Sequence, residues 1–279
     1  MPNIINVPAF SDNYIWLICD ESQKKGLIVD PGDPRQLITL LENENIQPIG
    51  IILTHLHFDH ANGLAKLNAL YPDIPIYGPE SEYKLLSDNP NPPTYGPATN
   101  CYQYVTHTLK GNETLSFAEV DCHFEVINIP GHTSGHIAYY DEANKNLFCG
   151  DTLFAGGCGR VFDGTFKELH DSLQKIKALP EDTLIHCAHE YTLDNLGFAQ
   201  WVEPDNSDLK HRIDADRALI DADKATVPSL LSLEIKTNPF LRTDNEDVIK
   251  RVEEACGKSL TSPAEVFAEM RLWKDREYD

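Results

Sequence analysis

Four potential metal ligands fall within seven consecutive residues of the chain. The segment Thr54–His60 reads T-H-L-H-F-D-H and directly follows an apolar run. Imidazole and carboxylate groups together are typical ligands of zinc, iron and manganese. If the segment continues a strand, His55 and His57 point to one face of it. Asp59 and His60 then lie where the chain turns, so the spacing indicates two metal positions; the alternative interpretation is a histidine-rich surface loop.

Three further potential ligands follow predicted strands elsewhere in the chain, and they are His132, Asp151 and His189. His132 comes directly after a Pro-Gly turn. Asp151 follows a glycine at a strand end, where a carboxylate can lie between two ions. Together with the four residues of the first segment, these three give a candidate set of seven ligands for two metal ions.

Three other polar residues are interpreted as neighbours of these ligands or as core residues. Asp30 ends a predicted strand and is either a hydrogen-bond partner of a ligand histidine or a cap of the following turn. His136 is interpreted as a neighbour of the ligands, with metal binding as the less favoured alternative, and His186 as a core residue inside a predicted strand.

The elements that must position these residues have the pattern of an α/β domain. Segments rich in β-branched and aromatic residues at 4–7, 14–19 and 26–30 predict an antiparallel opening. Helical spacing over 34–44 predicts a helix that leads into the first ligand segment. Residues 79–104 are rich in proline, so we expect them to form an irregular surface excursion, to which no function is assigned.

The pattern becomes mostly helical from about residue 193. Four helical segments, broken by prolines, are expected at 195–202, 207–225, 246–256 and 263–273. We therefore predict a metal-binding catalytic domain over residues 1–190 and a helical domain over residues 191–279.

Composition limits the possible partners. The 279 residues carry a formal net charge of -21, which argues against nucleic acid or an anionic membrane surface as a partner. The seven cysteines include no C-x-x-C pair, which disfavours a disulfide framework. The start of the chain has no signal-peptide pattern, and no apolar run approaches the ~18 residues of a membrane span. We expect a reduced, cytoplasmic protein that acts as a monomer.

Six motifs in this order resemble those of the metallo-β-lactamase superfamily and, within it, of the glyoxalase II family, the hydroxyacylglutathione hydrolases. They are T-H-L-H-F-D-H at 54–60, P-G-H-T-S-G-H at 130–136, G-D-T-L-F at 150–154, G-C-G-R at 157–160, A-H-E-Y-T at 188–192 and R-x-x-K at 271–274. One departure is Phe162, where some family members carry a tyrosine.

The resemblance implies an αββα sandwich that holds two divalent metal ions, expected to be zinc with iron or manganese as alternatives, followed by a helical domain that binds glutathione. It implies that His55, His57 and His132 hold the first ion, that Asp59, His60 and His189 hold the second, and that Asp151 bridges both. It also implies that glutathione is bound by Arg160, Tyr191, Arg271 and Lys274.

The reaction that the resemblance implies is hydrolysis of S-D-lactoylglutathione and other S-(2-hydroxyacyl)glutathiones, the second step of methylglyoxal detoxification. A hydroxide shared by the two metals would attack the thioester carbonyl, and Asp59 would orient this hydroxide. Because the chain is so acidic, Arg160, Arg271 and Lys274 are expected to form a local positive rim for the carboxylates of glutathione. The alternative for the last two is an exposed cationic helix end, favoured by the helix dipole.

Three other functions remain as alternatives. Two are enzymes: another hydrolase of the superfamily, or an iron-dependent glutathione persulfide dioxygenase. The third is an inactive metal-binding scaffold, against which the complete set of seven ligands argues. Metal content and oxygen consumption distinguish the enzymes.

Overall fold

The computed structural model describes residues 2–89, 95–96 and 99–278, which form two compact units. The first unit contains the residues up to Asn128 and the segment Thr133–Gly150. The second contains Ile129–His132 and the residues from Asp151 onward. The domain boundary expected between residues 190 and 191 remains a prediction.

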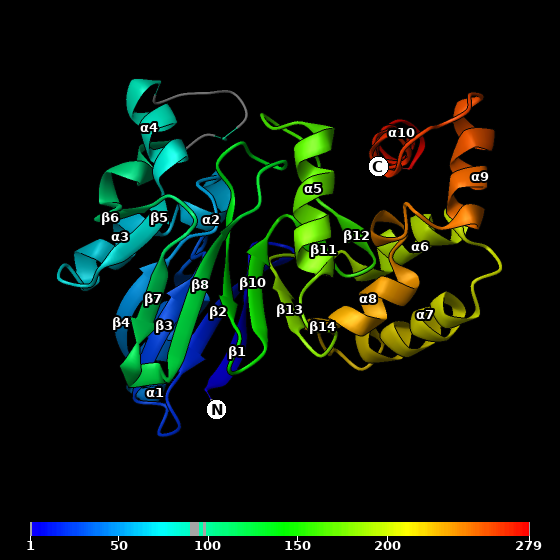
Figure 1. The fold of residues 1–279 in the computed structure, drawn as a ribbon. Helices are drawn as coiled ribbons and strands as arrows, with labels where there is room; N and C mark the ends of the chain where they lie inside the picture. Colours follow the sequence, from blue (N-terminus) through cyan, green and yellow to red (C-terminus); the bar gives the residue numbers. More distant parts are fainter. Residues whose placement is uncertain (1, 90–94, 97–98, 279) are drawn as a thin grey trace. The chain divides into compact units, whose positions relative to one another are not determined.

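A mixed sheet forms one layer of the first unit (Figure 1). Its strands, in order across the sheet, are β1 (Asn3–Ala9), β2 (Asn13–Cys19), β3 (Lys25–Val29), β4 (Gln47–Ile52), β5 (Ile76–Pro79) and β6 (His107–Leu109). The first three strands pair antiparallel, which confirms the predicted opening, and β3 to β6 pair parallel. Residues that follow parallel strands gather at one edge of the sheet, which is the usual place for a ligand in such folds.

Four antiparallel strands form the second layer of this unit, and they are β7 (Thr114–Phe117), β8 (Cys122–Asn128), β9 (Ile137–Asp141) and β10 (Asn146–Gly150). The two layers pack against each other, with the rings of Trp16 and Phe148 6.5 Å apart. The Tyr139 hydroxyl donates a hydrogen bond of 2.8 Å to the carbonyl oxygen of Leu53. This bond fixes the chain just after β4, where the first candidate ligands begin.

Helices α1 (Arg35–Glu44) and α3 (Leu64–Leu70) pack on the first sheet through an apolar cluster. The buried leucines that the helices contribute are Leu37, Leu41, Leu64 and Leu67. Full burial of one such side chain stabilises the fold by about 1.5–3 kcal/mol. The spacing that predicted a helix over 34–44 therefore reflects a real apolar face. A short 3-10 helix, η2 (Ala118–Val120), precedes β8.

The prediction for residues 79–104 is wrong for the part that forms helix α4 (Glu80–Asp88). Glu82 is only 1% exposed, so α4 is packed against the rest of the unit. A 3-10 helix, η1 (Thr99–Tyr104), ends the segment. The prolines that suggested irregular structure all fall at 90–94 and 97–98, outside the described residues.

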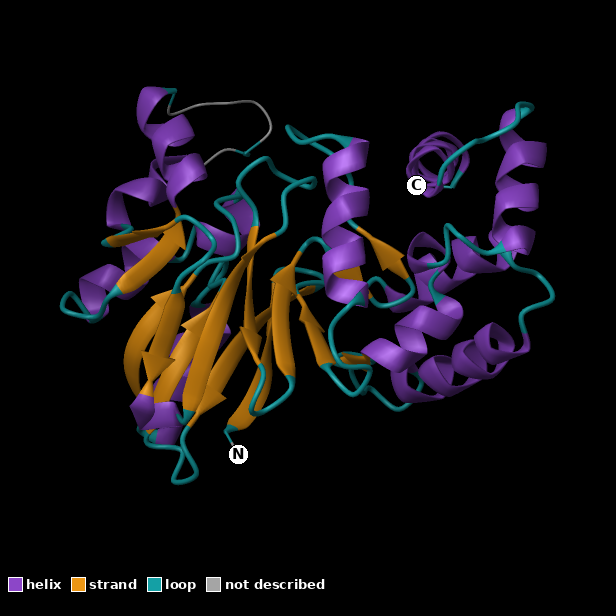
Figure 2. Cartoon of the chain, viewed as in Figure 1, coloured by secondary structure: helices purple, strands orange, loops and turns teal. Residues whose placement is uncertain are grey.

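The second unit is mostly helical (Figure 2). Its helices are α5 (Phe166–Lys177), α6 (Thr192–Val202), α7 (Ser207–Ile220), α8 (Leu231–Thr237), α9 (Glu246–Cys256) and α10 (Pro263–Glu277), with the 3-10 helix η3 (Pro239–Leu241). Its strands are the hairpin β11 (Leu153–Phe154) and β12 (Gly157–Cys158), and the pair β13 (Leu184–Cys187) and β14 (Ser229–Leu230).

Local capping explains where α5 begins. The backbone N–H of Glu168 donates to Thr165 Oγ1 at 3.2 Å, and the Thr165 hydroxyl donates to the Glu168 carboxylate at 2.8 Å. This pairing is a variant of the capping box, in which the two side chains satisfy the first turn. Helix α7 ends at Ile220, earlier than predicted, and α8 was not predicted at all.

None of the helices in the described part of the chain combines the length and the apolar character that crossing a membrane requires.

Candidate metal centre

The first candidate ligands lie in a loop after β4 and at the start of a short helix, α2 (Phe58–Ala61). The strand that we expected to reach His55 ends at Ile52. The loop nevertheless brings the imidazoles together, because the ring of His55 lies 4.6 Å from that of His57 and 4.0 Å from that of His60. All three rings are buried. Buried imidazoles this close to one another suit a shared metal centre.

Asp30 supports this loop through both of its carboxylate oxygens. One oxygen accepts the backbone N–H of Thr54 at 2.8 Å, and the other accepts the Thr54 hydroxyl at 2.7 Å. The second oxygen also lies 3.2 Å from Nδ1 of His60. Because a carboxylate only accepts, Nδ1 carries the proton and Nε2 is left for a metal. Of the two interpretations of Asp30, the structure therefore favours a hydrogen-bond partner of a candidate ligand histidine.

Glu82 of α4 is a supporting residue that the sequence did not reveal. Its carboxylate accepts the backbone N–H of Leu56, between His55 and His57, at 2.6 Å, and it also accepts the hydroxyl of Thr133. This carboxylate therefore ties together two ligand-bearing segments of the sequence. The only available signal was the short helical pattern of residues 80–88, which neighbouring prolines obscured.

Asp59 is held in place by contacts within the first unit. Its Oδ2 accepts a hydrogen bond of 3.1 Å from the side-chain amide of Asn13 and lies 3.5 Å from Nε2 of His60. The backbone at Gly32 passes so close that an added Cβ would lie 1.7 Å from the Asp59 carbonyl oxygen. Only glycine fits this close approach.

The remaining candidates, His132, Asp151 and His189, lie in the second unit. One carboxylate oxygen of Asp151 is 3.5 Å from Nε2 of His132 and 3.3 Å from Nε2 of His189. One carboxylate oxygen therefore lies close to both imidazoles. Nδ1 of His132 lies 2.8 Å from the carbonyl oxygen of Arg160, which again leaves Nε2 for a metal.

Seven side chains offer ligand atoms in two groups. The first group is His55, His57 and His132, and the second is Asp59, His60, Asp151 and His189. Within each group the ligand atoms all lie within 4.8 Å of one another. These are the seven residues that the sequence nominated, and their donor set is compatible with a dinuclear metal site.

His136 and His186 belong to neither group among the described residues. The ring of His136 stacks on that of His55 at 4.6 Å, and its Nδ1 lies 3.1 Å from the carbonyl oxygen of Ile137. His186 lies inside β13, where burial lowers its pKa to about 3. The two interpretations, neighbour and core residue, agree with these positions.

Arg271 and Lys274 of α10 are buried, at 1% and 3% exposure, which excludes the exposed helix end considered above. Arg271 Nη1 donates to the carbonyl oxygen of Cys158 at 3.2 Å, and Nη2 donates to Asp275 at 2.8 Å. Lys274 Nζ lies 5.3 Å from the ring centroid of Tyr278. Burial raises the pKa of the Cys158 thiol to about 11, although these two cations oppose the shift.

The other predicted glutathione contacts, Arg160 and Tyr191, are exposed. The Tyr191 ring stacks on His189, with centroids 4.7 Å apart and planes 10° apart. Phe162 is 47% exposed and packs its ring against that of His132 at 5.1 Å. Tyr191 therefore packs against the candidate ligand His189, and Phe162 packs against the candidate ligand His132.

Comparison with known proteins agrees with this geometry. Residues 10–189 match the family model of the metallo-beta-lactamase superfamily, which covers more than half of the chain. Residues 190–277 match the model described as the hydroxyacylglutathione hydrolase C-terminus. The hydroxyacylglutathione hydrolase of Nitrosomonas eutropha is 42% identical, over 99% of this chain and 99% of the relative. That of Pseudomonas aeruginosa is 41% identical, over 99% and 100%. The chain therefore belongs to the hydroxyacylglutathione hydrolases within that superfamily.

Solved structures show the same fold. The BLEG-1 B3 metallo-beta-lactamase aligns with a TM-score of 0.60 and 25% identity over 86% of this chain and 99% of that chain. TTHA1623, solved in a di-iron-bound form, aligns with a TM-score of 0.58 and 25% identity over 86% and 100%. The predicted fold class, α/β with mixed sheets flanked by helices and a helical C-terminal region, is confirmed.

Proposed function

We propose that the chain hydrolyses S-D-lactoylglutathione, and other S-(2-hydroxyacyl)glutathiones, to glutathione and the free 2-hydroxy acid. The observation that carries the proposal is the full-length similarity, at 41–42% identity, to hydroxyacylglutathione hydrolases. The two groups of ligand atoms support it, because a metal-dependent hydrolase of this family needs such a centre.

Seven residues would hold two divalent ions. His55, His57 and His132 would bind one ion, Asp59, His60 and His189 the other, and Asp151 both. We propose zinc, while iron and manganese accept the same donors. Bound ions of this kind lower the pKa of water from 15.7 to about 7 and so supply a hydroxide nucleophile near neutral pH.

The chain's own residues orient the ligands and the nucleophile. Asp30 and the carbonyl of Arg160 accept hydrogen bonds from Nδ1–H of His60 and of His132, so each ring presents Nε2. Asn13 donates to Oδ2 of Asp59 and so helps to fix the carboxylate that would orient a water molecule. These contacts fix the groups before substrate binds, which reduces the reorganisation that the reaction needs.

The leaving group needs little help. When the water oxygen adds to the thioester carbon, the C–S bond breaks and the sulfur departs with the electron pair. A thiol of pKa about 8.5 is stable as a thiolate, so no strong general acid is required, and the thiolate takes its proton from solvent.

Glutathione binding is assigned to Arg160, Tyr191, Arg271 and Lys274. A net charge of -21 repels the carboxylates of glutathione, so cations must be concentrated where it binds. Arg271 and Lys274 of α10 supply two such cations one helical turn apart, and the bonds of Arg271 to Asp275 and to the Cys158 carbonyl hold its guanidinium in place.

The proposal also covers features of the whole protein. We infer a catalytic domain over residues 1–190, a glutathione-binding domain over 191–279, and a cytoplasmic monomer. Size-exclusion chromatography with light scattering tests the last point, and a mass near 31.4 kDa is the expected result.

A parallel assay of thiol release and oxygen consumption tests the reaction. The proposal predicts one thiol released per thioester consumed, with no oxygen uptake. Oxygen consumption with glutathione persulfide would instead support the dioxygenase alternative. A metal-loaded protein that catalyses neither reaction would support the scaffold alternative.

A further inference from the structure

The buried carboxylate of Glu234, in α8, lies at the centre of a hydrogen-bond network in the second unit. Its Oε1 accepts from Arg212 Nη2 and from the Ser229 hydroxyl, both at 2.6 Å. Its Oε2 accepts from the backbone N–H of Gly156 at 2.9 Å and from the side-chain amide of Asn238 at 3.2 Å. Glu234 is 0% exposed, so four donors fix a carboxylate that is removed from solvent.

The same network holds the β11–β12 hairpin by its backbone. Asn238 Nδ2 donates to the carbonyl oxygens of Phe154 at 3.3 Å and Gly157 at 2.9 Å. Asn195 Nδ2 donates to the carbonyl oxygen of Ala155 at 3.2 Å. An added Cβ at Gly157 would lie 2.4 Å from Cγ of Asn195, so the Asn195 side chain packs directly against the hairpin backbone.

The residues directly after the hairpin hold His132. The carbonyl oxygen of Arg160 lies 2.8 Å from His132 Nδ1, and the backbone N–H of Phe162 donates to the His132 carbonyl at 2.9 Å. An added Cβ at Gly159 would lie 3.0 Å from His132 Nδ1. A shift of the hairpin would therefore move the acceptor that fixes the tautomer of this imidazole.

We propose that Glu234 is a positioning residue for the metal centre, acting through the hairpin on His132. It holds the backbone of Gly156, and with Asn238 it fixes the Arg160 carbonyl where His132 donates its Nδ1 proton. This inference rests on the proposed function, because it requires His132 to bind a metal ion. Residues that orient a metal ligand in this way typically contribute 10- to 100-fold to metal affinity.

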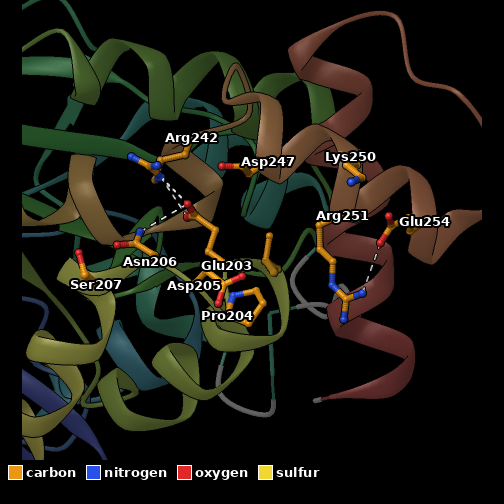
Figure 3. Close-up of a pocket in the computed structure, with 11 residues that line it drawn as sticks. Glu203, Pro204, Asp205, Asn206, Ser207, Arg242, Asp247, Lys250, Arg251 and Glu254 are labelled. Atoms are coloured by element: carbon orange, nitrogen blue, oxygen red, sulfur yellow. Dashed lines mark hydrogen bonds and ion pairs between the residues drawn. The ribbon is translucent and has the colours of Figure 1, made fainter.

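Glu203 provides a matched control in the same unit. It is 7% exposed, and Arg242 Nε donates to both of its oxygens at 3.0 Å (Figure 3). Asn206 donates to it at 3.4 Å. Glu203 is thus a second buried carboxylate paired with an arginine, and the partners shown in Figure 3 lie outside the hairpin.

The test is a titration of the metal-free proteins with Zn2+ against a chromophoric chelator, combined with urea unfolding. The variants are Glu234→Gln, Asn238→Ala and Glu203→Gln. Asn238→Ala keeps the Arg212–Glu234 pair and removes two hydrogen bonds to the hairpin, so it tests the inference even if Glu234→Gln does not fold.

The expected result is that Glu234→Gln and Asn238→Ala each lower the affinity for one of the two zinc ions about 10- to 100-fold. Glu203→Gln is expected to bind both zinc ions with affinities within about threefold of the wild type. This holds even if its urea midpoint falls as much as the midpoints of the other two variants. Wild-type affinities in the first two variants, or an equal loss in Glu203→Gln, would overturn the inference. Failure of the proposed function would be distinguishable from failure of this inference. In that case the wild type would bind two zinc ions and hydrolyse no thioester.

Discussion

Nδ1 of His60 lies 3.2 Å from Oδ2 of Asp30, and the same oxygen accepts the hydroxyl of Thr54. One carboxylate thus fixes both the tautomer of a candidate ligand and the loop that carries the neighbouring one. Asp30 directly follows β3, so the first sheet positions this carboxylate beside the candidate metal centre.

Replacing Asp30 by Asn should weaken zinc binding about 10- to 100-fold, because the new amide donor faces the Nδ1 proton of His60. The affected ion should be the one assigned to Asp59, His60, Asp151 and His189. Zinc competition titration measures the change. Asp20→Asn is the control, since Asp20 accepts backbone N–H groups of an exposed turn. Equal zinc affinity in the two variants would contradict this role of Asp30.

Replacing Lys274 by Ala should raise KM for S-D-lactoylglutathione about tenfold or more, while kcat changes by less than about threefold. Hydrogen bonds to charged groups contribute about 1.5–3 kcal/mol, and the lysine is assigned to binding, not to the reacting carbonyl. Steady-state kinetics provides the measurement. Arg276→Ala removes an exposed cation of the same helix and should leave KM unchanged. A kcat effect without a KM effect would argue against the assignment.

Replacing Gly159 by Ala should disrupt the centre, because the new Cβ would lie 2.0 Å from the Asp151 carbonyl oxygen. Zinc content after dialysis should fall below that of the wild type. Gly78→Ala is the control, since its Cβ would meet Val105 at 3.3 Å, a tight contact that a side chain can relieve. Full zinc retention in Gly159→Ala would show that this backbone can move.

The buried imidazole of His186 should make the protein less stable in acid. Burial lowers its pKa to about 3, whereas an unfolded histidine titrates near 6.5. Between these values the unfolded state binds a proton that the folded state does not, so stability falls as pH decreases, by up to about 1.4 kcal/mol per pH unit. His186→Gln should reduce this slope in urea unfolding between pH 6.5 and 4, and an unchanged slope would contradict the prediction. His211→Gln, at an exposed site, should retain it.

The ligands were predictable because metal chemistry restricts residue types and spacing. Thr54–His60 places four donors on a short segment, so it is conspicuous in a single sequence. The structure brings together the ligand atoms of all seven nominated residues, while metal binding by them remains a prediction. The strands of the antiparallel opening also followed from local residue patterns, whereas the parallel pairing of β3 to β6 was not predicted.

The supporting residues were not predictable, because their roles depend on tertiary contacts. Glu82 and Glu234 are acidic residues in short helices, and nothing in their local sequence shows that they are buried. Arg271 and Lys274 were expected on a rim, whereas packing around α10 buries both. Burial of a charge depends on partners that are distant in sequence, such as Cys158 for Arg271.

The most direct test of the account is to add Zn2+ stepwise to metal-free protein and to measure hydrolysis of S-D-lactoylglutathione at each step. The account predicts that thiol release rises until about two zinc ions are bound per chain and then stays constant. A protein that binds two zinc ions and releases no thiol from this substrate would contradict it.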